Sequence, residues 1–165
     1  KDMPTNIFRI SYIGRLYEFQ STALIEQAVH ELNLPNLELN IHTHEYQPIP
    51  LDKVGDELRH SSIVLVLTNP NTKGMMTTKF YEAFGCEKPV LCTPSDNGLL
   101  AQTIRQTNAG LASSDINEIK EFIIEKYREW QQNGYTRQAV INKEQFSREK
   151  QAQQFEQLFL QCIQQ

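Results

Sequence analysis

The heptapeptide SSIVLVL, residues 61–67, constrains the fold more than any other part of the chain. Its apolar residues follow one another without the apolar and polar alternation of a half-exposed strand, which is typical of a strand buried on both faces of a parallel sheet. Parallel neighbours are joined by crossover connections, and these are usually helices. The run therefore predicts an α/β fold with helices on both faces of the sheet.

Strand and helix patterns alternate along the rest of the chain. Strands are predicted at residues 6–14, 36–44, 61–67 and 89–93 and around Leu111. Helices are predicted at residues 21–32 and 50–61, as a short helix that starts near Thr77 and contains Glu82, at 98–106, from residue 113 or 114 to 134, and at 147–164. Short connections between alternating elements predict a Rossmann-like parallel sheet in a single domain over residues 1–165.

Local signals refine three of these elements. Residues 36–44 alternate apolar and polar, which predicts a half-buried or edge strand. Ser21 is the expected N-cap of the first helix. Ser113 or Ser114 is expected to cap the fifth helix, with Glu118 as its capping-box partner.

Composition excludes several classes of protein. The 165 residues are 39% hydrophobic and 22% charged, with a formal net charge of -4 and no long basic run, which argues against a nucleic-acid partner. The longest apolar run, residues 63–67, is far shorter than the roughly 20 residues of a membrane-spanning helix. The three cysteines, Cys86, Cys92 and Cys162, have no CxxC spacing and are interpreted as reduced core residues of a cytoplasmic protein.

Ligands of such sheets bind at the carboxyl ends of the strands, near the point where the strand order reverses. The residues expected there are 14–20, 46–48, 68–78 and 93–98. In the first of these segments, Gly14 ends a strand and Arg15 follows it. Glycine allows a sharp turn and close approach of a ligand, and arginine can form two hydrogen bonds to a diphosphate. A turn glycine beside a surface arginine is the alternative interpretation.

The segment TNPNTKGMMTTKFYE leads through Gly74 into a helix start. The free N–H groups of such a start favour an anion, and no Asp or Glu occupies the loop or the first turn. Thr77 and Thr78 add hydroxyl donors, and Lys73 and Lys79 add positive charge. The pattern suits an external phosphate, and an ordinary threonine N-cap is the alternative.

Glu82 lies one turn into the same helix. Helical spacing places four apolar residues on one face, so that Glu82 and Thr78 point away from it; the four are Met76, Phe80, Ala83 and Phe84. A free carboxylate there can accept hydrogen bonds from the two hydroxyls of a ribose. An exposed glutamate paired with Lys79 is the alternative.

Other chemistries receive little support. His42 and His44 would lie on one face of a strand as two metal ligands do, but no third ligand follows at a recognisable spacing, so no metal site is predicted. No serine lies in a Gly-x-Ser-x-Gly elbow; this holds for Ser61, Ser62 and Ser95. The glycines form neither a GxGxxG fingerprint nor a Walker loop, which argues against a dinucleotide oxidoreductase and a P-loop ATPase.

Four segments in order resemble the C-terminal, donor-binding half of GT-B glycosyltransferases. They are SYIGRLYEFQ, residues 61–92, IRQTNAGLASSDINEIKEFI and FSREKQAQQFEQLF. The resemblance is to the family 4 retaining enzymes that build bacterial surface polysaccharides, and it extends from Asn6 to about Leu160. Its most specific piece is KFYEAFGCEKPVL, which is similar to the family pattern K-x-x-E-Y-x-A-x-x-K-P-I-L.

The resemblance implies a role for each matching residue. Glu82 would bind the ribose hydroxyls, Gly14 and Arg15 the donor diphosphate, and the helix start with Lys79 the distal phosphate. Residues 46–48 fall where the family contacts the base. The implied catalytic residues are Arg15, Lys79 and Glu82. The implied substrate-binding residues are Gly14, Gln20, Tyr46, Gln47, Pro48, Gly74, Thr77 and Thr78.

Two departures from the family pattern concern recognition of the sugar. The family has the pattern Glu-x7-Glu, but Gly74 stands eight residues before Glu82 in place of the first glutamate. The basic residue that the family carries shortly after the position of Arg15 is absent, and Gln20 lies nearby.

The function implied is transfer of a sugar, with retention, from a nucleotide-diphosphate sugar to a glycan or lipid-linked acceptor. No metal cofactor is implied. The acceptor-binding half would precede Lys1, and the protein would be cytoplasmic, with peripheral association at the inner face of the membrane left open. Two alternatives remain: a non-catalytic nucleotide-binding or degenerate transferase module, and a nucleotide-sugar epimerase of the same fold.

Overall fold

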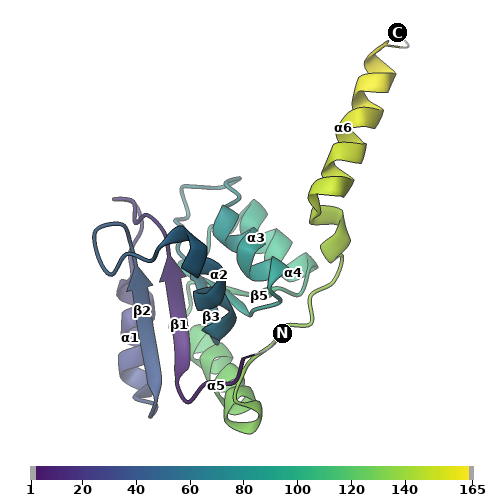
Figure 1. Ribbon diagram of the computed structural model, residues 1–165. Helices are drawn as coiled ribbons and strands as arrows, with labels where there is room; N and C mark the ends of the chain where they lie inside the picture. The colour runs from purple at the N-terminus through teal and green to yellow at the C-terminus, as the bar shows by residue number, and fades with distance from the viewer. Residues whose placement is uncertain (1–2, 164–165) are drawn as a thin grey trace.

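A computed structural model describes residues 3–163 and contains a five-stranded, fully parallel sheet. The strands are β1 (Phe8–Ile13), β2 (Leu37–His42), β3 (Ile63–Val66), β4 (Val90–Cys92) and β5 (Gly110–Ala112). Their order across the sheet is β2-β1-β3-β4-β5 (Figure 1). The predicted Rossmann-like α/β fold is confirmed, and β2 is an edge strand as its alternation predicted.

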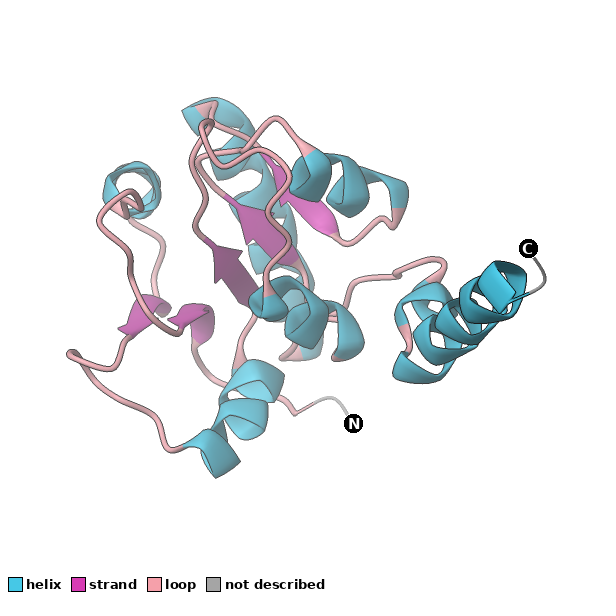
Figure 2. Ribbon diagram, turned by 90° about the horizontal axis from the view of Figure 1, so that it is seen from above, coloured by secondary structure: helices cyan, strands magenta, loops and turns pink. Residues whose placement is uncertain are grey.

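Helices cover both faces of this sheet (Figure 2). They are α1 (Ala23–Leu32), α2 (Leu51–His60), α3 (Thr78–Gly85), α4 (Leu99–Gln106), α5 (Ile116–Asn133) and α6 (Arg148–Ile163), with a 3₁₀ helix, η1, at Lys143–Phe146. Helices α1 and α5 pack on one face, and α2, α3 and α4 pack on the other. Strand–helix alternation therefore gave the correct order of elements, and only η1 was not predicted.

The central strand β3 explains why its sequence does not alternate. Ile63 and Leu65 pack into the apolar cluster under α1 and α5, whereas Val64 and Val66 pack into the cluster under α3 and α4. All four side chains are buried, and each contributes about 1.5–3 kcal/mol of hydrophobic stabilisation. Burial on both faces is thus what the run of apolar residues encodes.

Next to β3, the two faces of β1 differ. Phe8, Ile10 and Tyr12 point into the cluster under α1 and α5. The residues between them include Arg9 and Ser11, which face α2. This half of the sheet therefore has one apolar face and one polar face.

Gly110 opens β5 at a close approach of two strands. A Cβ at this position would lie 2.0 Å from the Val90 carbonyl oxygen, and its φ of +149° is one that other residues rarely adopt. Only glycine allows β5 to pair with β4 in this register.

Two predicted helix caps are wrong. The N-cap of α1 is Thr22, and the Ser21 hydroxyl oxygen accepts from the amide of Ala23, the first residue of the helix, at 3.2 Å. The N-cap of α5 is Asp115, whose carboxylate accepts from the amides of Asn117 and Glu118 at 2.7 and 3.3 Å. The carboxylate of Asp115 accepts from two amides and is therefore the cap, in place of the predicted hydroxyl of Ser113 or Ser114.

Two further predictions need correction. Strand β2 ends at His42 rather than residue 44, because Thr43 N donates to the Tyr46 carbonyl and closes a turn. Cys162 is exposed rather than a core residue, since α6 extends away from the sheet (Figure 1) and none of its described side chains is buried. The last residue of the predicted final helix, Gln164, lies outside the described residues. Within residues 3–163 no helix is both long and apolar enough to cross a membrane.

Candidate functional site

The carboxyl ends of β1 and β3 form the switch point of the sheet. From β1 the chain first moves outward to β2 and then returns past β1 to β3, so the connections that follow β1 and β3 leave in opposite directions. Open α/β sheets bind ligands in the crevice between such connections. Residues 14–20 and 67–77 are the two segments that border it here.

The loop after β1 is held in place by Gln20. Its side-chain amide donates to the Leu67 carbonyl at 2.6 Å, and its side-chain oxygen accepts from Tyr17 N at 3.0 Å. The Tyr12 hydroxyl adds hydrogen bonds to the Arg15 carbonyl at 2.5 Å and to Gln20 Oε1 at 3.3 Å. Gln20 therefore ties the end of β1 to the end of β3, which the sequence did not indicate.

The Tyr12 hydroxyl keeps its proton in this position. Burial, with a smaller contribution from the charge of Tyr17, raises the pKa of Tyr12 to about 12. It therefore remains a hydrogen-bond donor to the Arg15 carbonyl over the whole range in which proteins are normally studied. The backbone of Arg15 is fixed while its side chain is exposed, with Cζ 5.4 Å from the centre of the Tyr17 ring.

Lys79 of α3 lies directly against Gly14 at the end of β1. A Cβ on Gly14 would be 2.6 Å from Lys79 Cε and 2.7 Å from Lys79 Nζ, and Gly14 has a φ of +135°. The amine also lies 5.2 Å from the centre of the Tyr12 ring. Burial lowers the pKa of Lys79, while the charge of Glu82 acts in the opposite direction. A half-buried ammonium group thus joins the start of α3 to the turn after β1.

The start of α3 has a threonine N-cap, which was the alternative interpretation of this segment. Its N-cap is Thr77, whose hydroxyl oxygen accepts from Phe80 N at 3.2 Å, and its first turn contains no acidic residue. Phe80 is buried with Ala83 and Phe84, whereas Glu82 is exposed. Among residues 3–163 no carboxylate forms an ion pair with Lys79, which points toward Gly14 instead.

The predicted phosphate-binding and ribose-binding residues line two separate clefts. Arg15 and Leu16 line a cleft of about 490 Å³ together with residues 43–45. Thr78 and Glu82 line another, of about 410 Å³, together with Tyr81 of the same helix and with Phe146, Arg148 and Gln151 from η1 and α6. Lys79 lines neither cleft; it follows Thr78 in the chain, and its side chain ends beside Gly14, the residue before Arg15.

Some lining residues were missed by sequence reasoning. Phe146 packs its ring 5.4 Å from that of Phe84 and 6.0 Å from that of Tyr81, which brings η1 and the start of α6 beside α3. Arg148 follows in this wall. An aromatic residue directly before an amphipathic helix was the available signal, but it could not show which element the ring would contact.

The remaining predicted residues lie farther from this centre. Tyr46 and Gln47 line a third cleft of about 700 Å³, between their loop and residues of α1 and β2. Pro48 is exposed in the same loop. Gly74 is exposed in the loop before α3, with a φ of +88° and no atom within 4 Å of a Cβ placed there.

The described residues contain no group of three or more His, Cys, Asp or Glu side chains arranged to hold a metal ion. His42 and His44 do not share a strand face, because β2 ends at His42.

No family model and no curated protein matches the sequence. Among solved structures, the fold resembles that of Anabaena HepE in its crystal structure in complex with UDP-glucose, with a TM-score of 0.53. The similarity covers 78% of this chain at 14% sequence identity. The chain spans 41% of the length of HepE. At this level of identity the likeness concerns the fold, which is shared with a part of a protein that binds a nucleotide sugar.

Proposed function

We propose that this chain is the donor-binding part of a glycosyltransferase that uses a nucleotide-diphosphate sugar. The observation that carries the proposal is the position of Lys79, whose ammonium group lies beside Gly14 at the switch point of the sheet. It places a positive charge, a helix start without its own acidic residue and a glycine turn at one place. Together they favour the negative charge of a diphosphate.

In this proposal the diphosphate is the leaving group of the reaction. Negative charge develops on its oxygen as the bond to the sugar breaks, and Arg15, Lys79 and the free amides at the start of α3 stabilise that charge. No metal ion is needed for this step. Transfer with retention of configuration, as in the family 4 enzymes that the sequence resembles, is the finer form of the proposal.

Glu82 would hold the nucleoside. Its carboxylate is exposed in the cleft that Thr78 and Arg148 also line, and it is free to accept from two ribose hydroxyls. Residues 46–48 would contact the base. Gln20, whose side chain is fully engaged within the protein, would position the loop that carries Arg15 rather than touch the donor.

A second domain would supply the acceptor. Helix α6 exposes an apolar set that no described residue covers; it consists of Phe155, Leu158, Phe159, Leu160 and Ile163. The share of HepE that this chain spans also leaves room for another domain. A glycan or a lipid-linked sugar would enter between the halves, whose closure positions the reactants and excludes water. A cytoplasmic location, at the inner face of a membrane for a lipid-linked acceptor, belongs to the same proposal.

Gly74 favours a second candidate function. Because it replaces the first glutamate of the family pattern, the chain would bind a nucleotide without transferring a sugar in a degenerate, non-catalytic module. An epimerase of the same fold is the third candidate. A full-length enzyme that consumes donor and links sugar to an acceptor would support transfer, whereas a product that stays free would support epimerisation.

A thermal-shift panel with UDP, GDP, ADP and CMP tests nucleotide binding. A ligand at one hundred times its dissociation constant stabilises a protein by about 2.7 kcal/mol. Each kcal/mol moves the midpoint by roughly 2–4 °C for a chain of this size. We expect one nucleotide to shift the wild type, and Arg15→Ala and Glu82→Ala to reduce that shift.

Matched controls come from the surface of α5. Arg128→Ala and Glu121→Ala remove the same charges from exposed positions and should keep the full shift. Equal losses in the test and control variants would argue against the assigned site. No shift with any nucleotide at millimolar concentration, in this chain and in a longer one with its acceptor half, would overturn the proposal.

A further inference from the structure

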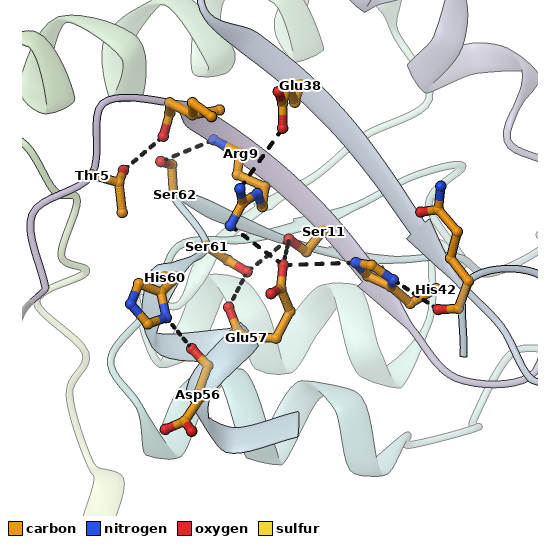
Figure 3. Close-up of polar contacts among 12 residues, drawn as sticks. Thr5, Arg9, Ser11, Glu38, His42, Asp56, Glu57, His60, Ser61 and Ser62 are labelled. Atoms are coloured by element: carbon orange, nitrogen blue, oxygen red, sulfur yellow. Dashed lines mark hydrogen bonds and ion pairs between the residues drawn. The ribbon is translucent and has the colours of Figure 1, made fainter. Parts of the chain in front are cut away.

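Arg15 has no carboxylate partner, unlike three other arginines of the chain. Those three pairings are Arg9 with Glu38 and Glu57 (Figure 3), Arg59 with Asp56, and Arg137 with Glu87. Among residues 3–163 the guanidinium group of Arg15 forms no ion pair and no hydrogen bond, although Glu45 lines the same 490 Å³ cleft. It lies instead beside the ring of Tyr17, whose centre is 5.4 Å from Cζ.

An aromatic ring holds an arginine differently from a carboxylate. An ion pair with Asp or Glu offsets the positive charge and engages the N–H groups that point at the carboxylate. The face of a ring attracts the cation as a whole, over distances of up to about 6 Å. The charge of Arg15 and the five N–H donors of its guanidinium group therefore stay available to an anion.

The ring of Tyr17 is itself stacked on the ring of Phe19. The two ring centres are 5.5 Å apart, and the planes differ by 7°, which is the parallel, offset arrangement that aromatic pairs favour. Tyr17 is 47% exposed and Phe19 is 44% exposed. Because nearly half of each side chain remains in water, packing of the core does not explain why two aromatic residues occupy this loop.

The backbone that carries the two rings is fixed by hydrogen bonds. Tyr17 N donates to Gln20 Oε1 at 3.0 Å, and Gln20 N donates to the Tyr17 carbonyl at 2.9 Å. From the loop after β3, Asn69 Nδ2 donates to the Phe19 carbonyl at 3.0 Å. The rings therefore project from a loop that is held at both β1 and β3, although their faces are partly open to solvent.

A fixed loop with stacked rings reduces the cost of ordering Arg15. An arginine side chain has several rotatable bonds, and it loses their freedom when it binds an anion. A guanidinium group that already lies against a ring loses less. A cation–π contact at an exposed site corresponds to a change of about two- to fivefold in an equilibrium constant.

We propose that Tyr17 is a positioning residue, whose ring, stacked on Phe19, holds the Arg15 guanidinium group at the 490 Å³ cleft with its donors free for a diphosphate. The contact between Tyr17 and Arg15 is a property of this chain alone. Its effect on diphosphate binding rests on the proposed function. The two are therefore tested separately.

The first test is made without nucleotide. Protons that lie over the face of an aromatic ring resonate upfield, so the δ-methylene protons of Arg15 report on the ring of Tyr17. NMR relaxation of the Arg15 Nε–H group gives an order parameter for the same side chain. We expect the wild type to show upfield δ-methylene signals and a higher order parameter than Tyr17→Leu, which lacks the ring.

Three further variants sharpen this test. Tyr17→Phe keeps the ring and should keep the wild-type signals of Arg15. Phe19→Leu removes the second ring and should lower the order parameter of Arg15 by less than Tyr17→Leu does. Tyr135→Leu makes the same substitution at a half-buried tyrosine in the bend after α5, and it should leave Arg15 unchanged.

The second test measures affinity for UDP, pyrophosphate and uridine by titration calorimetry. In Tyr17→Leu the dissociation constants for UDP and pyrophosphate should rise about two- to fivefold. Tyr17→Phe and Tyr135→Leu should bind as the wild type does. Uridine has no phosphate, so its affinity should be the same in Tyr17→Leu and in the wild type.

A double-mutant cycle separates positioning from a merely structural role. In an Arg15→Ala background the ring has no guanidinium group to hold, so Tyr17→Leu should cause no further loss of UDP affinity. If the ring instead only maintained the shape of the loop, its removal would weaken binding equally with and without Arg15.

Three outcomes would overturn the inference. They are Arg15 signals that are the same in the wild type and in Tyr17→Leu, additive losses in the double variant, and a loss for uridine as large as that for UDP, which would mean that the ring contacts the nucleoside itself. If neither a nucleotide nor pyrophosphate binds while the Arg15 signals behave as expected, the proposed function is wrong, whereas the contact that positions Arg15 is supported.

Discussion

The starts of α3 and α4 lie at the same edge of the sheet, but their free amides have different partners. At α4, the buried carboxylate of Asp96 accepts from the amides of Leu100 and Ala101 at 3.2 and 3.0 Å. At α3, the Thr77 hydroxyl oxygen accepts from one amide, that of Phe80, and the first turn contains the ammonium group of Lys79 and no carboxylate. The chain thus supplies the anion for α4 itself and leaves α3 suited to an external one.

The difference separates a structural helix start from a candidate binding site. Both starts have the same free amides and the same dipole, so both favour a negative charge. Asp96 satisfies that preference permanently and is 1% exposed. At the start of α3, the positive charge of Lys79 increases the preference for an anion. Thr78, the first residue of this helix, is exposed to solvent.

Removal of the α4 carboxylate should have the largest effect. Asp96→Ala leaves two buried amides without an acceptor, and hydrogen bonds to charged groups contribute about 1.5–3 kcal/mol each. We expect the free energy of unfolding in urea to fall by roughly 2–3 kcal/mol in total after relaxation of the site. Asp96→Asn keeps one acceptor and should lose less. A loss below about 0.5 kcal/mol, the range of ordinary surface changes, would contradict the structural role.

Removal of the α3 cation should act on binding instead. Lys79→Met deletes a charge-assisted contact to phosphate, and we expect the dissociation constant for UDP to rise about 10- to 100-fold, the equivalent of roughly 1.5–3 kcal/mol. Stability in the absence of nucleotide should not fall, because a partly buried charge is removed. Titration calorimetry measures the constant, and Lys53→Met on the exposed face of α2 is the control. Equal affinities in the two variants would contradict the assigned site.

The pH dependence of stability and of binding should have opposite signs at Lys79. Burial lowers its pKa in the folded chain, so between the lowered and the ordinary pKa the unfolded chain binds more protons, and this group makes stability rise with pH. Nucleotide binding needs the ammonium form and should weaken over the same interval. Affinity for UDP measured from neutral to alkaline pH tests this, and Lys79→Arg should remove the decrease because arginine stays charged.

An acid placed at the start of α3 should make it resemble α4. Thr77→Asp keeps an N-cap and adds a negative charge, which stabilises a helix start by about 0.3–1 kcal/mol. We therefore expect a small gain in stability without nucleotide and a loss of UDP affinity. Thr77→Ser is the control, and it should leave both unchanged. A tighter complex with UDP in the aspartate variant would show that the α3 start does not receive the phosphates.

Local periodicity was enough to determine much of the structure. The run at residues 63–66 predicted a strand buried on both faces, and the spacing of Phe80, Ala83 and Phe84 predicted which side of α3 would be buried. Exposure of Glu82 followed from the same spacing. These features depend on residues within one or two turns of each other, so the sequence contains all the information they need.

Tertiary structure decided how these pieces meet. The contact of Lys79 with Gly14, the hydrogen bond of Gln20 to Leu67 and the wall that Phe146 adds beside α3 each join residues more than 40 positions apart. They depend on the order of strands in the sheet, which periodicity does not determine. The wrong caps have the same origin, because several neighbouring polar side chains could cap a helix and packing selects among them. The sequence by itself thus determined the elements and their buried faces, whereas the strand order determined which side chains share a cleft.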